Sequence, residues 1–108
     1  ALTAISGYYS AYKTKKAEIY FYNRFNDQIT KAMTGDSGSK ATIEIEMYPD
    51  WKEILIKGNS LTFVYKDRTS TYSLSYKVKS TEIITSSGTY IIVNNNKEDF
   101  ILEALFES

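Results

Sequence analysis

The chain has 108 residues, and its 13 basic and 13 acidic side chains give a formal net charge of zero. It contains neither His nor Cys, which excludes the usual proton carrier at neutral pH, thiolate nucleophiles, zinc-thiolate sites and disulfides. A balanced charge gives no field that would draw the chain to nucleic acid or to an anionic membrane. The length predicts one domain over residues 1–108, and we expect no nucleic-acid partner and no cofactor.

The first third of the chain predicts one long helix. Apolar residues recur there at spacings of three and four, with no proline. Gly35 and the polar loop behind it are typical of a left-handed residue that ends a helix, so we expect a helix over residues 1–34. Its apolar residues form two sets: Leu2, Ile5, Tyr9, Tyr12 and Ile19, then Tyr22, Phe25, Ile29 and Met33. At about 100° per residue, the stretch Leu2 to Tyr12 lies on a different face from Phe25 to Met33.

Two interpretations of this rotated pattern stay open. In one, the whole helix twists over a single sheet with a broad apolar face. In the other, the second half of the helix packs on its own sheet, while the first half meets other chains.

Residues 41–106 predict an antiparallel sheet, because the apolar period changes there to two. Turn residues such as Pro49-Asp50 and Gly58-Asn59 separate the alternating runs, and short connections favour antiparallel neighbours. The fold class expected is α+β, with the long N-terminal helix packed on an antiparallel meander of about six strands. The runs lie at residues 43–47, 54–57, 61–66, 72–78, 90–93 and 100–102, with 82–85 as a weaker candidate.

Few residue patterns suggest catalysis. Glu44 and Glu46 would share one face of a strand, where two carboxylates can share a proton or a hard cation. Asp36 lies in a polar loop but lacks the regular acidic spacing of a calcium loop. The segment 35–40 superficially resembles a phosphate loop, but it follows a helix and precedes a strand, which is the wrong order. A Ser-Lys dyad remains formally open, and we expect no enzyme and no metal site.

Other patterns are typical of binding surfaces or of ordinary packing. The basic stretch 13–16 is either the polar face of an amphipathic helix or a contact for an acidic partner. Tyr72 and Tyr76, with Tyr65 beside them, are either a stacking row or part of the core. Trp51 follows a turn and either caps the edge of the core or anchors a partner. We take Trp51 and Tyr48 as candidate partner contacts.

The order of these segments resembles the globular part of archaeal type IV pilin-like proteins, the group made with class III signal peptides. The resemblance lies in a strand at Ile43–Met47, Pro49, a short strand at Glu53–Ile56, the turn Gly58-Asn59 and a strand at Leu61–Tyr65. The later run Ser87–Val93 is similar to a glycine-led strand of that family. Bacterial minor pseudopilins share the same helix-plus-sheet plan.

The resemblance implies a non-catalytic, filament or filament-associated subunit that is extracellular or at the cell surface. Its partners would be other pilin-like subunits, which meet the N-terminal helix at Leu2, Ile5, Tyr9 and Tyr12. A membrane would be contacted only through an apolar segment upstream of Ala1, which the sequence does not include. The alternative is a small secreted binding module for carbohydrate or protein that uses exposed Tyr and Trp side chains. An enzyme would require a lysine or carboxylate with a strongly shifted pKa in a cleft.

Overall fold

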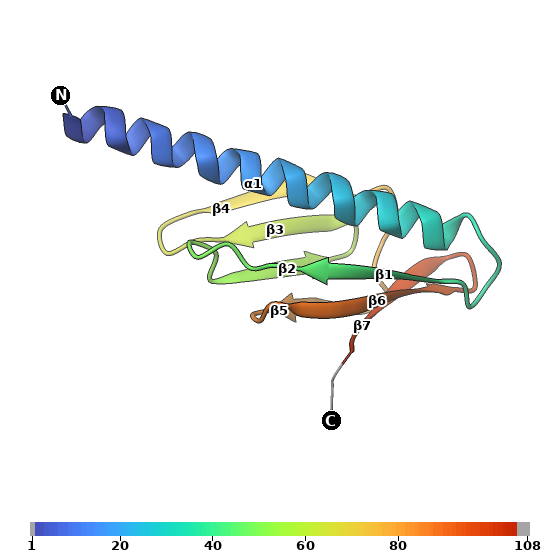
Figure 1. Cartoon of the computed structure of the whole chain (residues 1–108). Helices are drawn as coiled ribbons and strands as arrows, with labels where there is room; N and C mark the ends of the chain where they lie inside the picture. Colours follow the sequence, from blue (N-terminus) through green and yellow to red (C-terminus); the bar gives the residue numbers. More distant parts are fainter. Residues whose placement is uncertain (1, 106–108) are drawn as a thin grey trace.

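A computed structural model shows one long helix, α1 (Leu2–Met33), lying on two antiparallel sheets (Figure 1). The structure describes the backbone of residues 2–105 and the side chains of residues 13–105. The strands are β1 (Lys40–Ile45), β2 (Glu53–Lys57), β3 (Ser60–Val64), β4 (Thr69–Ser73), β5 (Glu82–Ile84), β6 (Gly88–Asn95) and β7 (Asp99–Ala104). The expected α+β class is therefore confirmed.

The sequence predicts a single meander of about six strands, but the structure has seven strands in two sheets. One sheet has the order β1-β6-β7 and the other has the order β4-β3-β2-β5. Strand β1 pairs with β6, with Ile43 opposite Tyr90, so the four strands of the second sheet are inserted between these two partners. Turn chemistry favours neighbours in the chain, and it contains no signal for such a distant pairing.

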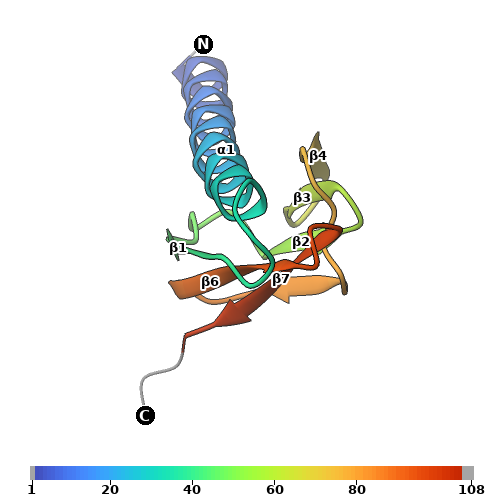
Figure 2. The same cartoon turned by 90° about the vertical axis from the view of Figure 1, so that its right-hand side faces the viewer.

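The core lies between the helix and the inner faces of both sheets (Figure 2). Phe25 on α1 meets Phe100 of β7 edge-to-face, with ring centroids 6.2 Å apart. Phe21 meets Phe63 of β3 in the same way at 5.6 Å. The two sheets therefore share one apolar cluster, and successive turns of the helix reach the two sheets separately.

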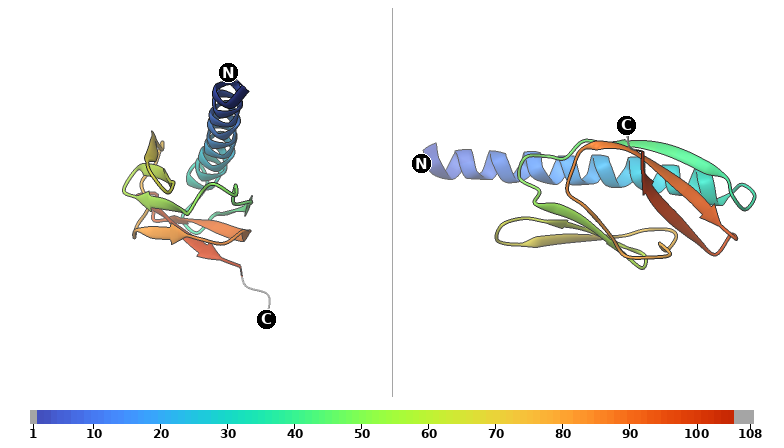
Figure 3. Two further views of the ribbon diagram at one scale, coloured as in Figure 1. Left: turned by 90° about the vertical axis from the view of Figure 1, so that its left-hand side faces the viewer. Right: turned by 90° about the horizontal axis from the view of Figure 1, so that it is seen from below.

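The N-terminal end of α1 extends beyond both sheets (Figures 1 and 3). Among the side chains of the helix that the structure describes, residues 13–33, the buried apolar residues of the core run from Phe21 to Met33. The later part of the helix therefore packs on its own sheets, and the role of the first half in meeting other chains stays a prediction.

The helix ends at Met33, one residue before the predicted end at residue 34, and Gly35 does not supply a left-handed residue. The glycines with positive φ are Gly38 (φ 90°) and Gly58 (φ 56°). Gly35 lies instead at a close approach, because a Cβ there would lie 2.4 Å from the Ser39 hydroxyl oxygen and would require that side chain to move. The buried Asn94 completes the helix end, since its Nδ2 donates to the carbonyl oxygens of Ala32 and Gly35 at 3.1 and 3.2 Å.

The run predicted as a strand at residues 72–78 is only partly one. Strand β4 ends at Ser73, and the chain then bends. Leu74 N donates to Asn59 O at 2.7 Å and Val78 N donates to Gly58 O at 2.9 Å. Both side chains are buried. The alternation of apolar and polar residues therefore identifies core positions here, although the backbone does not continue as a hydrogen-bonded strand.

Candidate functional site

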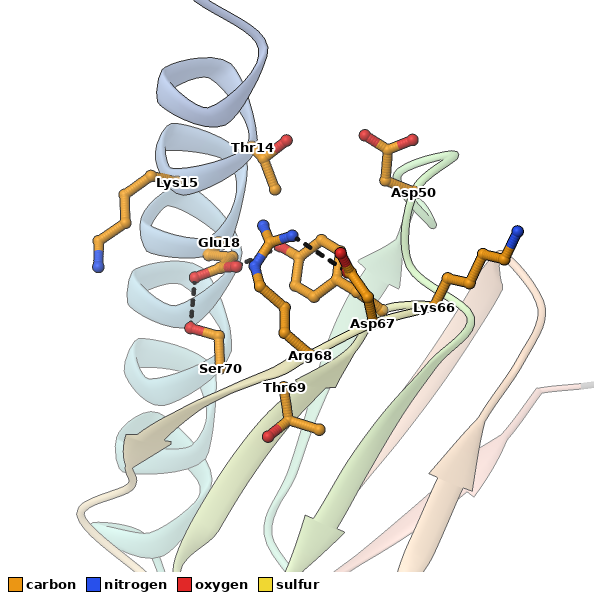
Figure 4. A pocket seen from close by; sticks show the side chains of 10 residues that line it. Thr14, Lys15, Glu18, Asp50, Lys66, Asp67, Arg68, Thr69 and Ser70 are labelled. Carbon is orange, nitrogen blue, oxygen red and sulfur yellow. Dashed lines mark hydrogen bonds and ion pairs between the residues drawn. The ribbon is translucent and has the colours of Figure 1, made fainter. Parts of the chain in front are cut away.

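A cleft of about 940 Å³ opens where α1 faces the turn between β3 and β4 (Figure 4). The helix contributes Thr14, Lys15 and Glu18 from one side. The facing wall is formed by the end of the β1–β2 loop and by the β3–β4 turn, and it comprises Asp50, Tyr65, Lys66, Asp67, Arg68, Thr69 and Ser70.

Glu18 forms the floor of this cleft, and its side chain is almost fully buried, with 2% exposed. The Tyr72 hydroxyl donates to its Oε1 at 2.7 Å, and the Ser70 hydroxyl donates to the same oxygen at 2.8 Å. The Tyr65 hydroxyl donates to its Oε2. A buried carboxylate needs such donors, because losing water without replacement would be costly. Three hydroxyls from the second sheet thus hold one helix side chain.

Tyr65 connects this network to the core and to the rim. The Trp51 Nε1 donates to the Tyr65 hydroxyl oxygen at 3.0 Å, and the Arg68 guanidinium lies 3.9 Å from the centre of the Tyr65 ring. Burial, and next the hydrogen bond to Glu18, raise the pKa of Tyr65 well above its ordinary value. The same two causes raise the pKa of Tyr72 to about 12.

These tyrosines therefore stay protonated near neutral pH and act as hydrogen-bond donors, not as bases. The Ser70 hydroxyl also donates its hydrogen bond to Glu18 Oε1, at 2.8 Å, so it is not available as a donor to a ligand. The rim carries both signs of charge: Lys15, Lys66 and Arg68 against Asp50 and Asp67. Arg68 and Asp67 form an exposed ion pair at 3.7 Å. A cleft of this kind suits a polar ligand that offers both donors and acceptors.

The four side chains predicted to form an assembly interface, Leu2, Ile5, Tyr9 and Tyr12, lie outside the described side chains. Only their backbone is described, and it is helical. In the basic stretch that follows, Lys13, Lys15 and Lys16 are exposed while Thr14 is buried.

The structure places Trp51 in the core with 6% of its surface exposed, so it caps the core edge. Its ring packs on Phe63 with centroids 4.6 Å apart. Tyr48 is half-buried and lies beside Trp51, with centroids 5.7 Å apart. Both residues line a smaller groove of about 290 Å³ against Tyr20 and Arg24 of the helix. Their role as partner contacts stays a prediction.

The tyrosine row is divided between the core and the Glu18 network. Tyr65 is buried, while Tyr72 and Tyr76 are half-buried. The Tyr72 ring stacks on Tyr22 of the helix, with centroids 5.3 Å apart. One face of Tyr72 is therefore already occupied by an aromatic ring from the same chain.

Glu44 and Glu46 are both exposed, and they line a shallow hollow together with Arg24. Asp36 lies 3.9 Å from Lys97 in an exposed ion pair. Within residues 13–105, whose side chains are described, no three acidic side chains gather closely enough to hold a metal ion.

Sequence reasoning missed Glu18, although a signal for it exists. Glu18 precedes Tyr22, Phe25 and Ile29 at spacings of four, seven and eleven, so it falls on the same face as the buried apolar residues. An acid on that face must find donors in the core, and the tyrosines of β4 and of the β3–β4 turn are long enough to provide them.

Comparisons with known proteins identify no relative of this chain. No protein-family model matches the chain, and the searches of curated proteins and of solved structures also found no match. The described part of the chain contains no helix that is both long and apolar enough to cross a bilayer.

Proposed function

We propose that this chain is the folded domain of a pilin-like filament or filament-associated subunit at the cell surface, without catalytic activity. The proposal depends on the position of α1. The 32 residues of the helix rise about 48 Å, and its N-terminal end extends beyond both sheets (Figure 1). A helix that is longer than the sheets it covers can serve two partners, its own sheets and a neighbouring subunit.

In this proposal the projecting part of the helix provides the assembly interface through Leu2, Ile5, Tyr9 and Tyr12. Burying a large apolar side chain against a neighbour contributes about 1.5–3 kcal/mol. The sum over several such side chains is enough to hold subunits together once the ordering costs are met. The resemblance further implies about 20 apolar residues upstream of Ala1 in the reading frame, the length needed to span a bilayer.

Surface labelling in the cells that make the protein tests this proposal. The chain has no native Cys, so a single Lys57→Cys change in the exposed β2–β3 hairpin creates one reactive thiol. We expect a membrane-impermeant maleimide dye to label filaments on intact cells. The matched control is Ile54→Cys in the same strand, where the side chain is fully buried at 0% exposure and should react only after unfolding.

Label that reaches Lys57→Cys only after lysis would place the chain inside the cell and refute the proposal. Diffuse surface label without filaments would support a location at the cell surface but refute assembly into filaments. A reading frame that is short or polar upstream of Ala1 would remove the support that the resemblance gives.

The cleft above Glu18 favours a second candidate, a small secreted binding module for a carbohydrate or a protein. Its volume of about 940 Å³ and its mixed donor and acceptor lining match a hydroxyl-rich ligand. In this case Arg68, which already stacks on Tyr65, would contact the ligand at the rim.

Amide chemical shifts during titration with neutral and acidic oligosaccharides would test this second candidate. We expect shifts confined to residues 65–70 and to the facing turn of α1, and their loss in Arg68→Ala. Lys57→Ala, an exposed change away from the cleft, should leave the shifts intact. Spectra that do not change with any oligosaccharide would remove carbohydrate as the ligand.

A further inference from the structure

Two surfaces on opposite sides of the molecule carry opposite charge together with exposed apolar residues. The first surface, the helix crest, consists of the exposed residues Lys13, Lys16, Ile19 and Tyr20 on α1. Ile19 is 42% exposed and Tyr20 is 66% exposed. Between residues 13 and 24 the helix has four basic residues, and its single acid there is Glu18, which is buried. The crest is therefore basic with an apolar centre.

The second surface, the outer face, is the side of the β1-β6-β7 sheet that points away from α1. Ile91 pairs with Thr42 on one side and with Glu103 on the other, so these three side chains form one row. Glu44 lies opposite Thr89 in the next row, and the Thr89 carbonyl accepts a hydrogen bond from Leu105 N at 2.8 Å.

The centre of the outer face is apolar and its border is largely acidic. Ile91, Val93 and Ile101 are half-buried, and Leu105 is 52% exposed. Glu44 and Glu103 are exposed beside them, and Lys40 lies in the row at the far end. The helix covers only the opposite face of this sheet (Figure 2), so these apolar residues have no covering layer within the described chain.

We propose that the helix crest of one copy docks on the outer face of a second copy. Lys13 and Lys16 then face Glu44 and Glu103, while Ile19 and Tyr20 cover Ile91, Ile101 and Leu105. Opposite charges set the orientation of such a contact and the apolar centre supplies its affinity. Because the two surfaces lie on opposite sides of the molecule, the contact is heterologous and can repeat into an open chain of copies.

This inference adds a specific contact to the proposed filament, and it involves a different part of the helix from Leu2, Ile5, Tyr9 and Tyr12. It rests on the proposed function only in that a filament needs a repeating contact. Self-association of the purified chain tests it separately from cell-surface labelling.

Charge exchange is the decisive experiment, with sedimentation velocity of the purified chain as the measurement. We expect the wild-type chain to associate at low salt at concentrations up to about 1 mM, where a weak contact is half populated, and to dissociate as salt screens the charges. Lys13→Glu/Lys16→Glu and Glu44→Lys/Glu103→Lys should each weaken association at least tenfold. The quadruple variant, with all four changes in one chain, should recover it.

A mixture of the two double variants should also associate, because the crest and the outer face of one variant then carry the charge opposite to the outer face and the crest of the other. Asp36→Lys/Glu98→Lys is the matched control for Glu44→Lys/Glu103→Lys, since it makes the same change in net charge at other exposed sites and should associate like wild type. Circular dichroism verifies that every variant is folded.

A wild-type chain that stays monomeric, a quadruple variant that stays monomeric, or weakening by only one of the two double variants would each overturn the inference. Filaments labelled on cells together with any of these results would preserve the proposed function and reject this contact.

Discussion

Glu18 shows how one polar residue positions the helix on the second sheet. Together with Tyr22 and Asn26 it forms a row at four-residue spacing on α1. The Tyr22 hydroxyl donates to the Ser73 carbonyl, and Ser75 N donates to Asn26 Oδ1 at 2.9 Å. All three side chains bond to the stretch from Ser70 to Ser75, so this row fixes where the helix lies along β4. Apolar packing alone is less directional and would allow the helix to slide.

Removing the Glu18 carboxylate should be strongly destabilising. Glu18→Ala leaves the hydroxyls of the buried Tyr65 and the half-buried Tyr72 without their acceptor, and an unsatisfied buried donor costs about 1–3 kcal/mol. We expect the free energy of unfolding in urea to fall by about 2–4 kcal/mol. Glu98→Ala, at an exposed position, should change it by less than about 0.5 kcal/mol. An equally small effect of Glu18→Ala would show that the network carries no net stability.

The tyrosines of this network predict a loss of stability in alkali. Because the pKa of Tyr72 rises from 10.0 to about 12 on folding, the unfolded chain ionises first, and this ionisation stabilises the unfolded state relative to the folded one. The contribution of Tyr72 is therefore complete below pH 10 and is lost as the pH rises towards 12.

Denaturation at a series of pH values measures this contribution. We expect the stability difference between wild type and Tyr72→Phe to shrink between pH 10 and 12. Tyr20→Phe, at a side chain that is 66% exposed, is the control for the removal of a tyrosine hydroxyl outside the Glu18 network. A difference for Tyr72→Phe that stays constant with pH would contradict the role assigned to burial and to Glu18.

The helix also covers an open edge of the first sheet. Strand β1 is an edge strand, and its outward carbonyl groups accept hydrogen bonds from helix side chains. Gln28 Nε2 donates to Thr42 O at 2.6 Å, and Arg24 Nη2 donates to Glu44 O at 3.2 Å. Unpaired edge groups are templates for pairing with another chain, so these two side chains protect the monomer from strand addition.

Replacing the two capping side chains should increase aggregation more than it lowers stability. Arg24→Ala/Gln28→Ala exposes the two carbonyl groups to water, which should cost only about 1–2 kcal/mol, but it opens the β1 edge. We expect faster growth of light scattering on gentle heating. Lys31→Ala, an exposed change on the same helix, should behave as wild type. Equal scattering by both variants would show that the edge is protected by other means.

The two sheets belong to one cooperative structure, because the aromatic residues of the helix join them. Phe25 contacts Phe100 on one side and Phe21 on the other, with centroids 6.2 and 5.7 Å apart. Phe21 in turn contacts Phe63 and Trp51. A chain of ring contacts therefore leads from β7 to β3, and separating the sheets would expose all of it.

We expect the sheets to unfold in a single transition. Trp51 fluorescence reports the second sheet, while amide exchange of β6 reports the first, and their midpoints should coincide. Phe25→Ala removes a ring that is 0% exposed and should lower the stability of both sheets together by about 3–5 kcal/mol. Two separate midpoints in wild type would show that each sheet folds independently.

Local patterns in the sequence predicted a large part of this structure. Spacings of three and four predicted the helix to residue 34, one residue past its observed end at Met33, and alternation located most of the strands. Pro49 and Gly58 marked real turns, since Trp51 N donates to Tyr48 O at 3.0 Å and Gly58 has φ 56°. These features depend on neighbours in the chain, where periodicity and backbone preference act directly.

The tertiary structure decided the rest. The sequence has no local signal for the pairing of β1 with β6, because that register depends on which apolar faces meet after the intervening strands have formed their own sheet. The same holds for the cleft and the Glu18 network, whose members lie 47 to 54 positions apart. A buried carboxylate is defined by the donors that surround it, and only the folded chain brings those donors together.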